Sequence, residues 1–392
     1  MRPVRLTPLL ALAVLFQLTS VSFAEAQEDL ESRLEPVREE FGLPAMVAAV
    51  AVDGEIVAAG ATGLRALGHD APAEVEDRIH IGSDTKAMTA LLAGMAVEED
   101  LLSWNSTIGD VLGDKVPDMN ETLAEVRLEQ LLSHSSGIPS DTQEMIEIYF
   151  NANAFEHNLT DLRLMALDAW KDHEPVIPDD SPFQYANFGY LIAGTMIETA
   201  MGQPWEALIQ QRIFQPLELE TAGLGATATP GLIDALVGHS QENTGEPEAR
   251  PWGAAADIPP IMGPAGTAHM SILDFARWGA WISGGAHRGP KLVAPETLAY
   301  IMDPKVPAKI PNPPPGTPEE GGYALGWGIE QFDWADRPLH THNGSNSMNL
   351  AKILVDPEVD IAIVVATNIG GRQANLAAGY IMKELYLAYG GN

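Results

Sequence analysis

The chain of 392 residues has no cysteine and few basic residues. The absence of cysteine excludes a disulfide framework and attachment through a lipid-bearing cysteine. Only 22 Lys and Arg stand against 54 Asp and Glu, which gives a formal net charge of -32. Because a field of that sign repels phosphate groups, neither nucleic acid nor an anionic membrane is an expected partner.

A hydrophobic run long enough to cross a bilayer, about 20 residues, is lacking at the N-terminus. Two arginines precede the short apolar run Leu6 to Phe16, and small residues follow up to Ala24 and Ala26. This order is typical of a secretory signal peptide over residues 1–26, cleaved near Ala24 or Ala26. We therefore expect a periplasmic or secreted protein with no stable membrane anchor.

Both ends of the remaining chain carry strand patterns. The apolar run 45–52, the pair Asp53-Gly54 and a second apolar run predict a β-hairpin. Residues 349–355 and 360–367 predict a second hairpin, and 373–389 has the spacing of a helix that packs on the sheet. These patterns predict an α+β fold, with an antiparallel sheet built from residues 27–100 and 265–392.

The middle of the chain, residues 101–264, differs in character. Helical patterns cover 121–132, 159–170 and 190–201, so we expect a mainly helical inserted lobe. The stretches 227–264 and 303–322 are rich in Pro, Gly and Ala and have no sustained period, which indicates ordered loops. A cleft between two lobes is the expected place for a site.

The first candidate site is Ser83, which precedes the apolar helical segment 87–97. Lys86 lies three residues on, so it shares a helix face with Ser83 and can approach its hydroxyl. Burial in such a helix would lower the pKa of the lysine toward a value useful for proton transfer. The alternative interpretation is a serine N-cap followed by a surface lysine.

A second pair, Tyr185 and Asn187, stands two residues apart before a helical segment. A phenol beside a lysine ammonium is expected to have a lowered pKa and to accept a proton. An amide can orient the lysine and a substrate carbonyl. The alternative is an aromatic core residue next to a helix cap.

The third element is the segment 339–345, which contains His340, His342, Gly344 and Ser345. In an extended segment the two histidines share a face, and one of them could line the cleft. Gly344 would let a substrate backbone approach closely. A metal site is not expected, because two histidines are too few ligands and no companion motif occurs.

Taken in this order, the three elements resemble the serine β-lactamase-like family, which includes class C β-lactamases, D-Ala-D-Ala carboxypeptidases, D-aminopeptidases and esterases. Ser83 to Lys86 is similar to the family's Ser-x-x-Lys element, Tyr185 to Asn187 to its Tyr-x-Asn element, and 342–344 stands where lactamases have Lys-Thr-Gly. The segments 131–139, 264–266 and 322–327 also look like the family's connectors. The likeness spans nearly the whole mature chain.

The resemblance implies a β-lactamase/transpeptidase-like fold and a serine hydrolase that forms an acyl-enzyme on a small ester or peptide, with no cofactor. It implies that Tyr185 accepts the proton of Ser83, that Lys86 supplies charge, and that the backbone N–H groups of Ser83 and Ser345 hold the oxyanion. His342 replaces a lysine that β-lactamases use, so esterase or D-amino-acid peptidase activity is favoured over β-lactam cleavage. A catalytically silent peptidoglycan- or β-lactam-binding protein of the same fold is the alternative.

Overall fold

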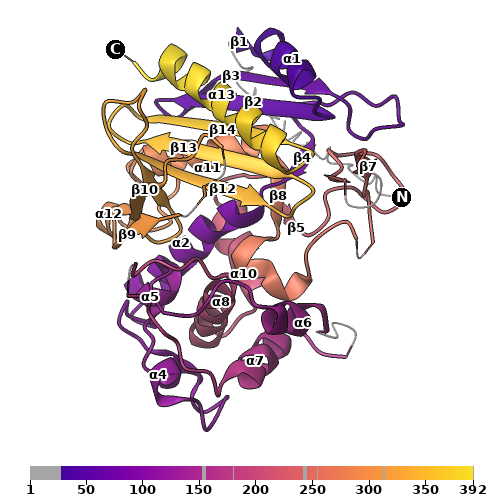
Figure 1. The fold of residues 1–392 in the computed structure, drawn as a ribbon. Coiled ribbons are helices and arrows are strands. Elements are labelled where there is room, and N and C mark those ends of the chain that lie inside the picture. The colour runs from indigo at the N-terminus through magenta and orange to yellow at the C-terminus, as the bar shows by residue number, and fades with distance from the viewer. Residues whose placement is uncertain are drawn as a thin grey trace, which may run out of the picture.

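The computed structural model describes residues 28–151, 156–179, 181–241, 245–253, 255–310, 312–313 and 315–391. The predicted signal peptide over 1–26 lies outside the described residues. The predicted α+β fold is confirmed, and both chain ends build the main sheet as expected (Figure 1).

The main sheet has nine strands in the order β1-β3-β2-β14-β13-β12-β11-β10-β9. The predicted hairpins form its centre, because β14 joins them by pairing with both β2 and β13. All neighbours run antiparallel except β1, which pairs parallel with β3. The strands are β1 Glu28–Asp29, β2 Ala45–Val52, β3 Glu55–Gly63, β9 Val306–Lys309, β10 Glu320–Tyr323, β11 Gly328–Glu330, β12 Leu339–Ser345, β13 Leu350–Asp356 and β14 Ile361–Thr367.

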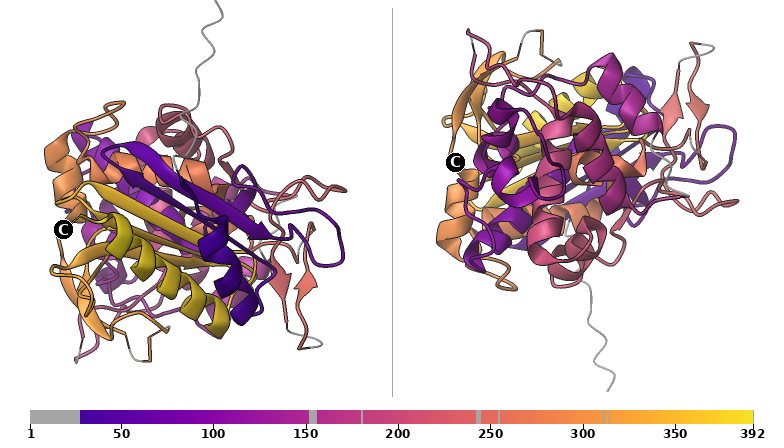
Figure 2. Two further views of the ribbon diagram at one scale, coloured as in Figure 1. Left: turned by 90° about the horizontal axis from the view of Figure 1, so that it is seen from above. Right: turned by 90° about the horizontal axis from the view of Figure 1, so that it is seen from below.

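Helices cover both faces of this sheet, so both faces are apolar (Figures 1 and 2). Alternate residues of β2 enter different cores: Met46 faces α1 (Glu31–Glu40) and α13 (Arg372–Tyr389), whereas Val47 faces α11 (Ile272–Ser283). This two-sided burial is the physical reason that the central strands read as continuous hydrophobic runs.

A mainly helical part lies below the sheet in Figure 1 and encloses the buried helix α8. The single helix expected over 121–132 is wrong, because Arg127 is extended and forms a bridge with Thr107. The helices here are α3 Ile108–Leu112, α4 Glu121–Ala124, α5 Leu128–Leu132, α6 Gln143–Asn151, α7 Leu159–Trp170, α8 Asn187–Met201 and α9 Trp205–Ile209, followed by one π-helical turn, Gln210–Phe214.

The two stretches expected to be loops contain short strands. Strands β9 and β10 form the edge of the main sheet, where Pro307 is tolerated because an edge strand need not donate from every residue. A small sheet combines β4 (Arg78–His80), β8 (Ala268–Ser271) and β5 (Gly223–Leu224). The other elements are β6 His239–Ser240, β7 Glu248–Ala249, η3 Pro260–Met262, α10 Gly263–Gly266 and α12 Pro295–Met302.

Helix α2 (Thr85–Glu98) connects the two parts of the molecule. It packs against α8, α10 and α12, and its residues 85–96 are buried on every side. The start of α2, the start of α8 and the end of β12 therefore meet at one place. Within the described part of the chain, every helix is too short or too polar to cross a membrane.

Candidate active site

Ser83 lies in the 3-10 turn Gly82–Asp84, between β4 and α2. Neither this turn nor α2 has a side-chain cap, so the interpretation of Ser83 as a helix N-cap is wrong. Its hydroxyl oxygen instead accepts a hydrogen bond of 3.0 Å from Lys86 Nζ. Ser83 is only partly buried, so a substrate can reach the hydroxyl.

Lys86 has no exposed surface and makes three polar contacts. Besides Ser83, its Nζ donates to Asn187 Oδ1 at 2.7 Å and to the carbonyl oxygen of Ala265 at 2.6 Å. Burial lowers the pKa of Lys86 to about 7, against the opposing effect of nearby acidic side chains. The predicted pairing and the predicted direction of the lysine pKa are both found in the structure.

Tyr185 stands just before α8, and its side chain lies close to that of Ser83. The Nζ of Lys86 lies 4.8 Å from the centre of the phenol ring. The expected lowering of the tyrosine pKa is wrong: burial raises it, because losing water destabilises the phenolate more than the nearby Ser83 hydroxyl stabilises it. Tyr185 is therefore a neutral phenol at pH 7.

The backbone at Tyr185 is held by His134, a buried residue with a positive φ of 56°. The carbonyl of His134 accepts from Gln184 N, its Nδ1 accepts from Ala186 N, and its ring lies 4.2 Å from the Tyr185 ring. The segment 131–139 thus positions the phenol. Sequence patterns alone gave no role to His134.

Asp141 is a further residue that the sequence did not reveal. Its Oδ2 accepts from Asn187 Nδ2 at 2.7 Å, and its Oδ1 accepts from Tyr149 OH at 3.0 Å. This contact orients the Asn187 amide so that the oxygen faces Lys86. The negative charge of Asp141 also opposes the lowering of the lysine pKa. The one feature of the sequence that could have pointed to Asp141 is its position shortly after the segment 131–139.

His342 and His340 share a face of β12, as predicted, but only His342 reaches the site. His342 Nε2 lies 3.0 Å from Tyr323 OH, and its Nδ1 lies 3.3 Å from Asp84 Oδ1. His340 instead contacts the carbonyl of Met302. Burial lowers the pKa of His342 to about 3, and Lys86 adds to this, so the imidazole is neutral.

Gly344 and Ser345 form the end of β12 beside the nucleophile turn. A Cβ on Gly344 would overlap the Ile81 carbonyl, and a Cβ on Gly82 would overlap Ser345 N. Only glycines permit these two backbone segments to approach so closely. The backbone nitrogens of Ser83 and Ser345 consequently lie where these two backbone segments touch.

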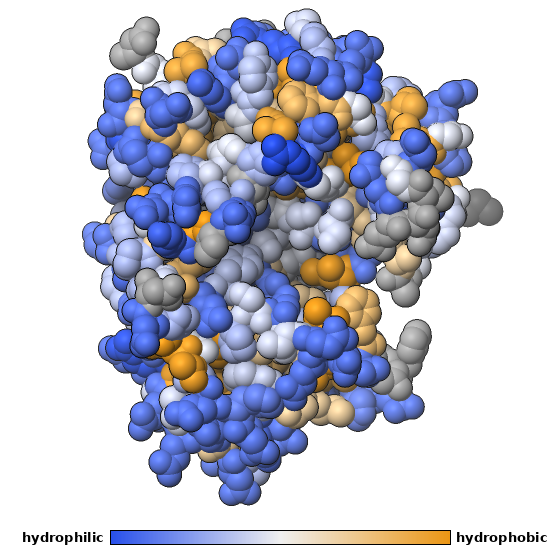
Figure 3. Space-filling view, in the orientation of Figure 1, coloured by the Kyte–Doolittle hydropathy of each residue, from blue (hydrophilic) through white to orange (hydrophobic). Residues whose placement is uncertain are grey.

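A cavity of about 430 Å³ opens beside Tyr185 and His342. Figure 3 shows the surface hollowed between the sheet and the helical part, in an otherwise largely hydrophilic face. The cavity wall is mostly apolar, with three glutamates and one lysine, Lys309, from the β9–β11 edge. Its wall includes Phe183, Ala308, Ile310, Tyr323, Glu319 and Glu320.

The described residues include no group of three or more His, Cys, Asp or Glu side chains arranged to hold a metal ion.

The fold and the Ser83-Lys86-Tyr185 constellation are those of a serine hydrolase of the β-lactamase type. The model of the Beta-lactamase family matches residues 30–386, and the chain belongs to this family. The resemblance read from the three motifs is thus confirmed.

Several relatives are similar over most of the chain. Penicillin-binding protein 4 of Amycolatopsis lactamdurans is 26% identical over 87% of this chain and 84% of its own. Unguisins hydrolase ungD of Aspergillus violaceofuscus is 24% identical over 82% of this chain, which spans 58% of that protein.

Among solved structures, the octameric penicillin-binding protein homologue from Pyrococcus abyssi has a TM-score of 0.71 and 25% identity, over 93% of this chain and 77% of its own. The D-amino acid amidase from Ochrobactrum anthropi SV3 has a TM-score of 0.69 and 17% identity, over 91% of this chain and 95% of its own.

Proposed function

We propose that the protein hydrolyses ester and amide bonds through an acyl-enzyme on Ser83. The observation that carries this proposal is the 3.0 Å contact between Ser83 Oγ and Lys86 Nζ, at a lysine whose pKa is lowered to about 7. A neutral amine keeps two N–H bonds for Asn187 and Ala265 and has a lone pair for the serine proton.

In the first step, Ser83 Oγ attacks the substrate carbonyl and Lys86 Nζ takes the hydroxyl proton. The tetrahedral oxygen carries the resulting negative charge, which the N–H groups of Ser83 and Ser345 stabilise by roughly 3 to 4 kcal/mol per donor. As the intermediate collapses, Tyr185 donates its phenolic proton to the leaving group and regains a proton from Lys86. Deacylation follows the same route in reverse, with water in place of the leaving group. The water attacks the acyl-enzyme while its proton passes through Tyr185 to Lys86, and Lys86 then returns a proton to Ser83 as the acid is released.

The resting proton positions favour this route over direct abstraction by Tyr185. The raised pKa of Tyr185 keeps its proton on the phenol, so the tyrosine can donate but is not an anionic base. Lys86, with a pKa of about 7, is partly neutral at physiological pH. The base role expected of Tyr185 therefore passes to Lys86 in this proposal.

For the substrate, we favour small esters and D-amino-acid amides over β-lactams. The neutral His342 provides no positive charge for a carboxylate at the position where lactamases have lysine. The mostly apolar cavity beside it suits an uncharged acyl or leaving group. Among the similar proteins are one named as a hydrolase and one named as a D-amino acid amidase, which supports this choice. We propose that this activity operates outside the cytoplasm.

Labelling with a fluorophosphonate probe tests the proposal. The probe should label the protein, and Ser83→Ala should remove the label while Ser106→Ala, a change at a partly exposed loop serine outside the site, should not. Absence of labelling in the folded protein would instead favour the catalytically silent binding protein.

A parallel assay compares a p-nitrophenyl ester, a D-Ala-D-Ala peptide and nitrocefin as substrates. The ester should give the highest rate, and preference for nitrocefin would contradict the role given to His342.

A further inference from the structure

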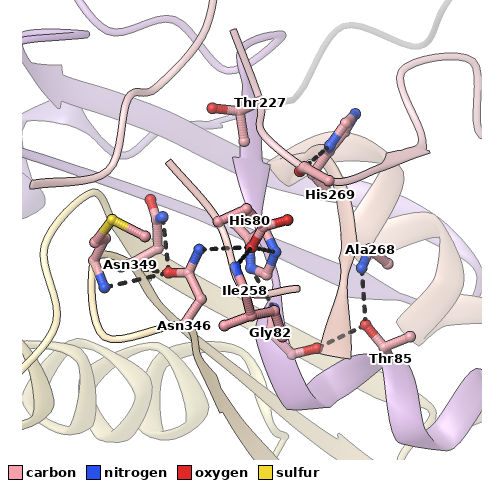
Figure 4. Close-up of polar contacts among 12 residues, drawn as sticks. His80, Gly82, Thr85, Thr227, Ile258, Ala268, His269, Asn346 and Asn349 are labelled. Carbon is pink, nitrogen blue, oxygen red and sulfur yellow. Dashed lines mark hydrogen bonds and ion pairs between the residues drawn. The ribbon is translucent and has the colours of Figure 1, made fainter. Parts of the chain in front are cut away.

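A second polar cluster lies beside the nucleophile turn and contacts it through Gly82. It joins three segments that are distant in sequence: the end of β4, the loop before η3, and the turn after β12. Figure 4 shows His80, Gly82 and Asn346 from these neighbouring segments linked by polar contacts. Asp257, in the loop before η3, contacts both of the other segments, through His80 and through Asn346.

His80 fixes one side of the cluster. Its Nδ1 accepts a hydrogen bond of 3.0 Å from Gly82 N, so the proton of the neutral ring stands on Nε2. This Nε2 lies 2.9 Å from Asp257 Oδ1, an ion-pair distance at which the ring N–H is not aligned for a hydrogen bond, and His80 is 1% exposed. A carboxylate at this distance stabilises the Nε2-protonated tautomer, which is the form that can accept from Gly82.

The contacts of Gly82 determine how Ser83 presents its backbone N–H. Thr85 Oγ1 donates to the Gly82 carbonyl at 2.6 Å and accepts from Ala268 N. Because that carbonyl and Ser83 N–H belong to one planar peptide group, holding the carbonyl also holds the N–H direction. The bond from Gly82 N to His80 fixes the preceding peptide, at a backbone φ of +54°.

Asn346 fixes the other side of the cluster. Its Nδ2 donates to Asp257 Oδ1 at 3.2 Å, and its Oδ1 accepts from the backbone nitrogens of Met348 and Asn349. The side chain therefore closes the turn between β12 and β13 and ties it to the loop of Asp257. Asn346 directly follows Ser345, so this tie restrains the Ser345 backbone.

We propose that Asp257, acting through His80 and Asn346, positions both backbone donors of the oxyanion site. One carboxylate oxygen sets the tautomer that holds Gly82 and also anchors the turn that carries Ser345. Asp257 is a positioning residue, because its contacts are with His80, Asn346 and its own loop rather than with Ser83 Oγ. This inference rests on the proposed function, since it assigns the two N–H groups to a tetrahedral intermediate.

The neighbouring histidine of the small sheet contacts a backbone carbonyl and does not compete with His80 for Asp257. His269 lies opposite His80 in the small sheet, and burial lowers the pKa of His269 to about 4. That ring is therefore neutral, and its Nδ1 lies 2.9 Å from the Gly225 carbonyl. Asp257 Oδ2 has no hydrogen-bond partner among the described residues, so Oδ1 makes the contacts on which the inference depends.

The test compares Asp257→Ala and Asp257→Asn in the full chain, with a p-nitrophenyl ester and a boronic acid that becomes tetrahedral on Ser83. Asp257→Ala should lower kcat about tenfold to hundredfold with KM within about twofold, and should weaken boronate binding by a similar factor, because misaligned donors mainly affect the tetrahedral state. Asp257→Asn keeps an oxygen acceptor and should recover kcat to within about threefold. Equal effects on kcat and KM, or an unchanged kcat in Asp257→Ala, would overturn the inference.

Asp234→Ala is the matched control, because Asp234 also organises its loop and bonds to β4, through Thr229 and Arg78, without contact to Gly82 or Asn346. It should leave boronate affinity unchanged. If Asp257→Ala does not fold, His80→Asn replaces it: the Asn oxygen can still accept from Gly82 but loses Asp257, and an unchanged kcat there would equally refute the proposal.

A measurement independent of turnover separates this inference from the proposed function. Nitrogen spectra of histidine-labelled protein should show His80 protonated on Nε2, with a changed signal in Asp257→Ala. A resting tautomer protonated on Nδ1 would overturn the inference even in an active enzyme. An inactive wild type with the expected His80 tautomer would count against the proposed function and would also remove the oxyanion role from the cluster.

Discussion

Removing the charge of Asp141 should extend activity to more acidic pH. Asp141 bonds to Asn187, whose oxygen accepts from Lys86, and its negative charge favours the protonated lysine. In Asp141→Asn that support is lost, so the pKa of Lys86 falls below its value of about 7. The neutral amine, which is the proposed base, then persists at lower pH. Asparagine keeps an oxygen for Asn187 Nδ2, so the geometry should be retained.

The size of the shift follows from the contacts. Two hydrogen bonds of 2.7 Å on either side of one amide group put the charges of Asp141 and Lys86 roughly 7 Å apart. At an effective dielectric constant of about 20, unit charges at roughly 7 Å interact by about 2.4 kcal/mol. Asp141 is partly exposed, so we expect screening to leave a shift of about 1 pKa unit.

The assay is kcat/KM for a p-nitrophenyl ester between about pH 5 and pH 9. In the wild type the acid limb should have its midpoint near the Lys86 pKa of about 7. Activity should then rise about tenfold between about pH 6 and pH 8. The midpoint should lie about one pH unit lower in Asp141→Asn, with the plateau within about threefold.

A matched control is Asp114→Asn, which removes an exposed charge from the same helical part of the molecule. Its midpoint should stay within about 0.2 pH units of the wild type, because solvent screens exposed charges at long range. An acid limb that moves to higher pH in Asp141→Asn, or does not move, would show that the titrating group is not Lys86.

Three other substitutions test separate parts of the structure. Tyr185→Phe should lower kcat at least about hundredfold while the acid limb stays near pH 7, because the proton donor is lost and Lys86 remains; an unchanged kcat would refute the donor role. Gly344→Ala should destabilise the fold by about 1 to 3 kcal/mol in thermal unfolding, because its Cβ meets the Ile81 carbonyl, and an unchanged Tm would show that the backbones can separate freely. Arg163→Met should cost about 3 to 5 kcal/mol in urea unfolding, because it leaves the buried Glu198 carboxylate without its partner at 3.1 Å, and adding Glu198→Gln should recover part of that loss. A loss under about 1 kcal/mol would show that water reaches Glu198.

The sequence by itself determined the features that depend on near neighbours in the chain. The hairpins at 45–63 and 350–367 could be predicted because apolar runs around a turn specify their own pairing. The Ser83–Lys86 pair could be predicted because three residues make nearly one helical turn. The meeting of distant motifs could be predicted only through the family resemblance. Spacing alone does not show that Asn187 contacts Lys86, because 101 positions separate them in the chain.

The edge of the sheet was beyond sequence reasoning for a similar reason. Strands β9 and β10 lack an alternation of apolar and polar residues, and they contain Pro and Gly. They are strands because β10 pairs with β11, and β9 in turn pairs with β10. The break at Arg127 likewise depends on its bridge to Thr107. Intrinsic preferences at these positions are weak, and tertiary pairing decides the conformation.

Only the tertiary structure decided the proton chemistry at Ser83. The same burial lowers the pKa of Lys86 and raises that of Tyr185, so the expected anionic phenol became a neutral donor. Asp141 and Asp257 acquire their proposed roles from contacts with segments far away in the chain. A pKa and a hydrogen bond depend on which groups exclude water and which charges remain nearby, and folding settles both.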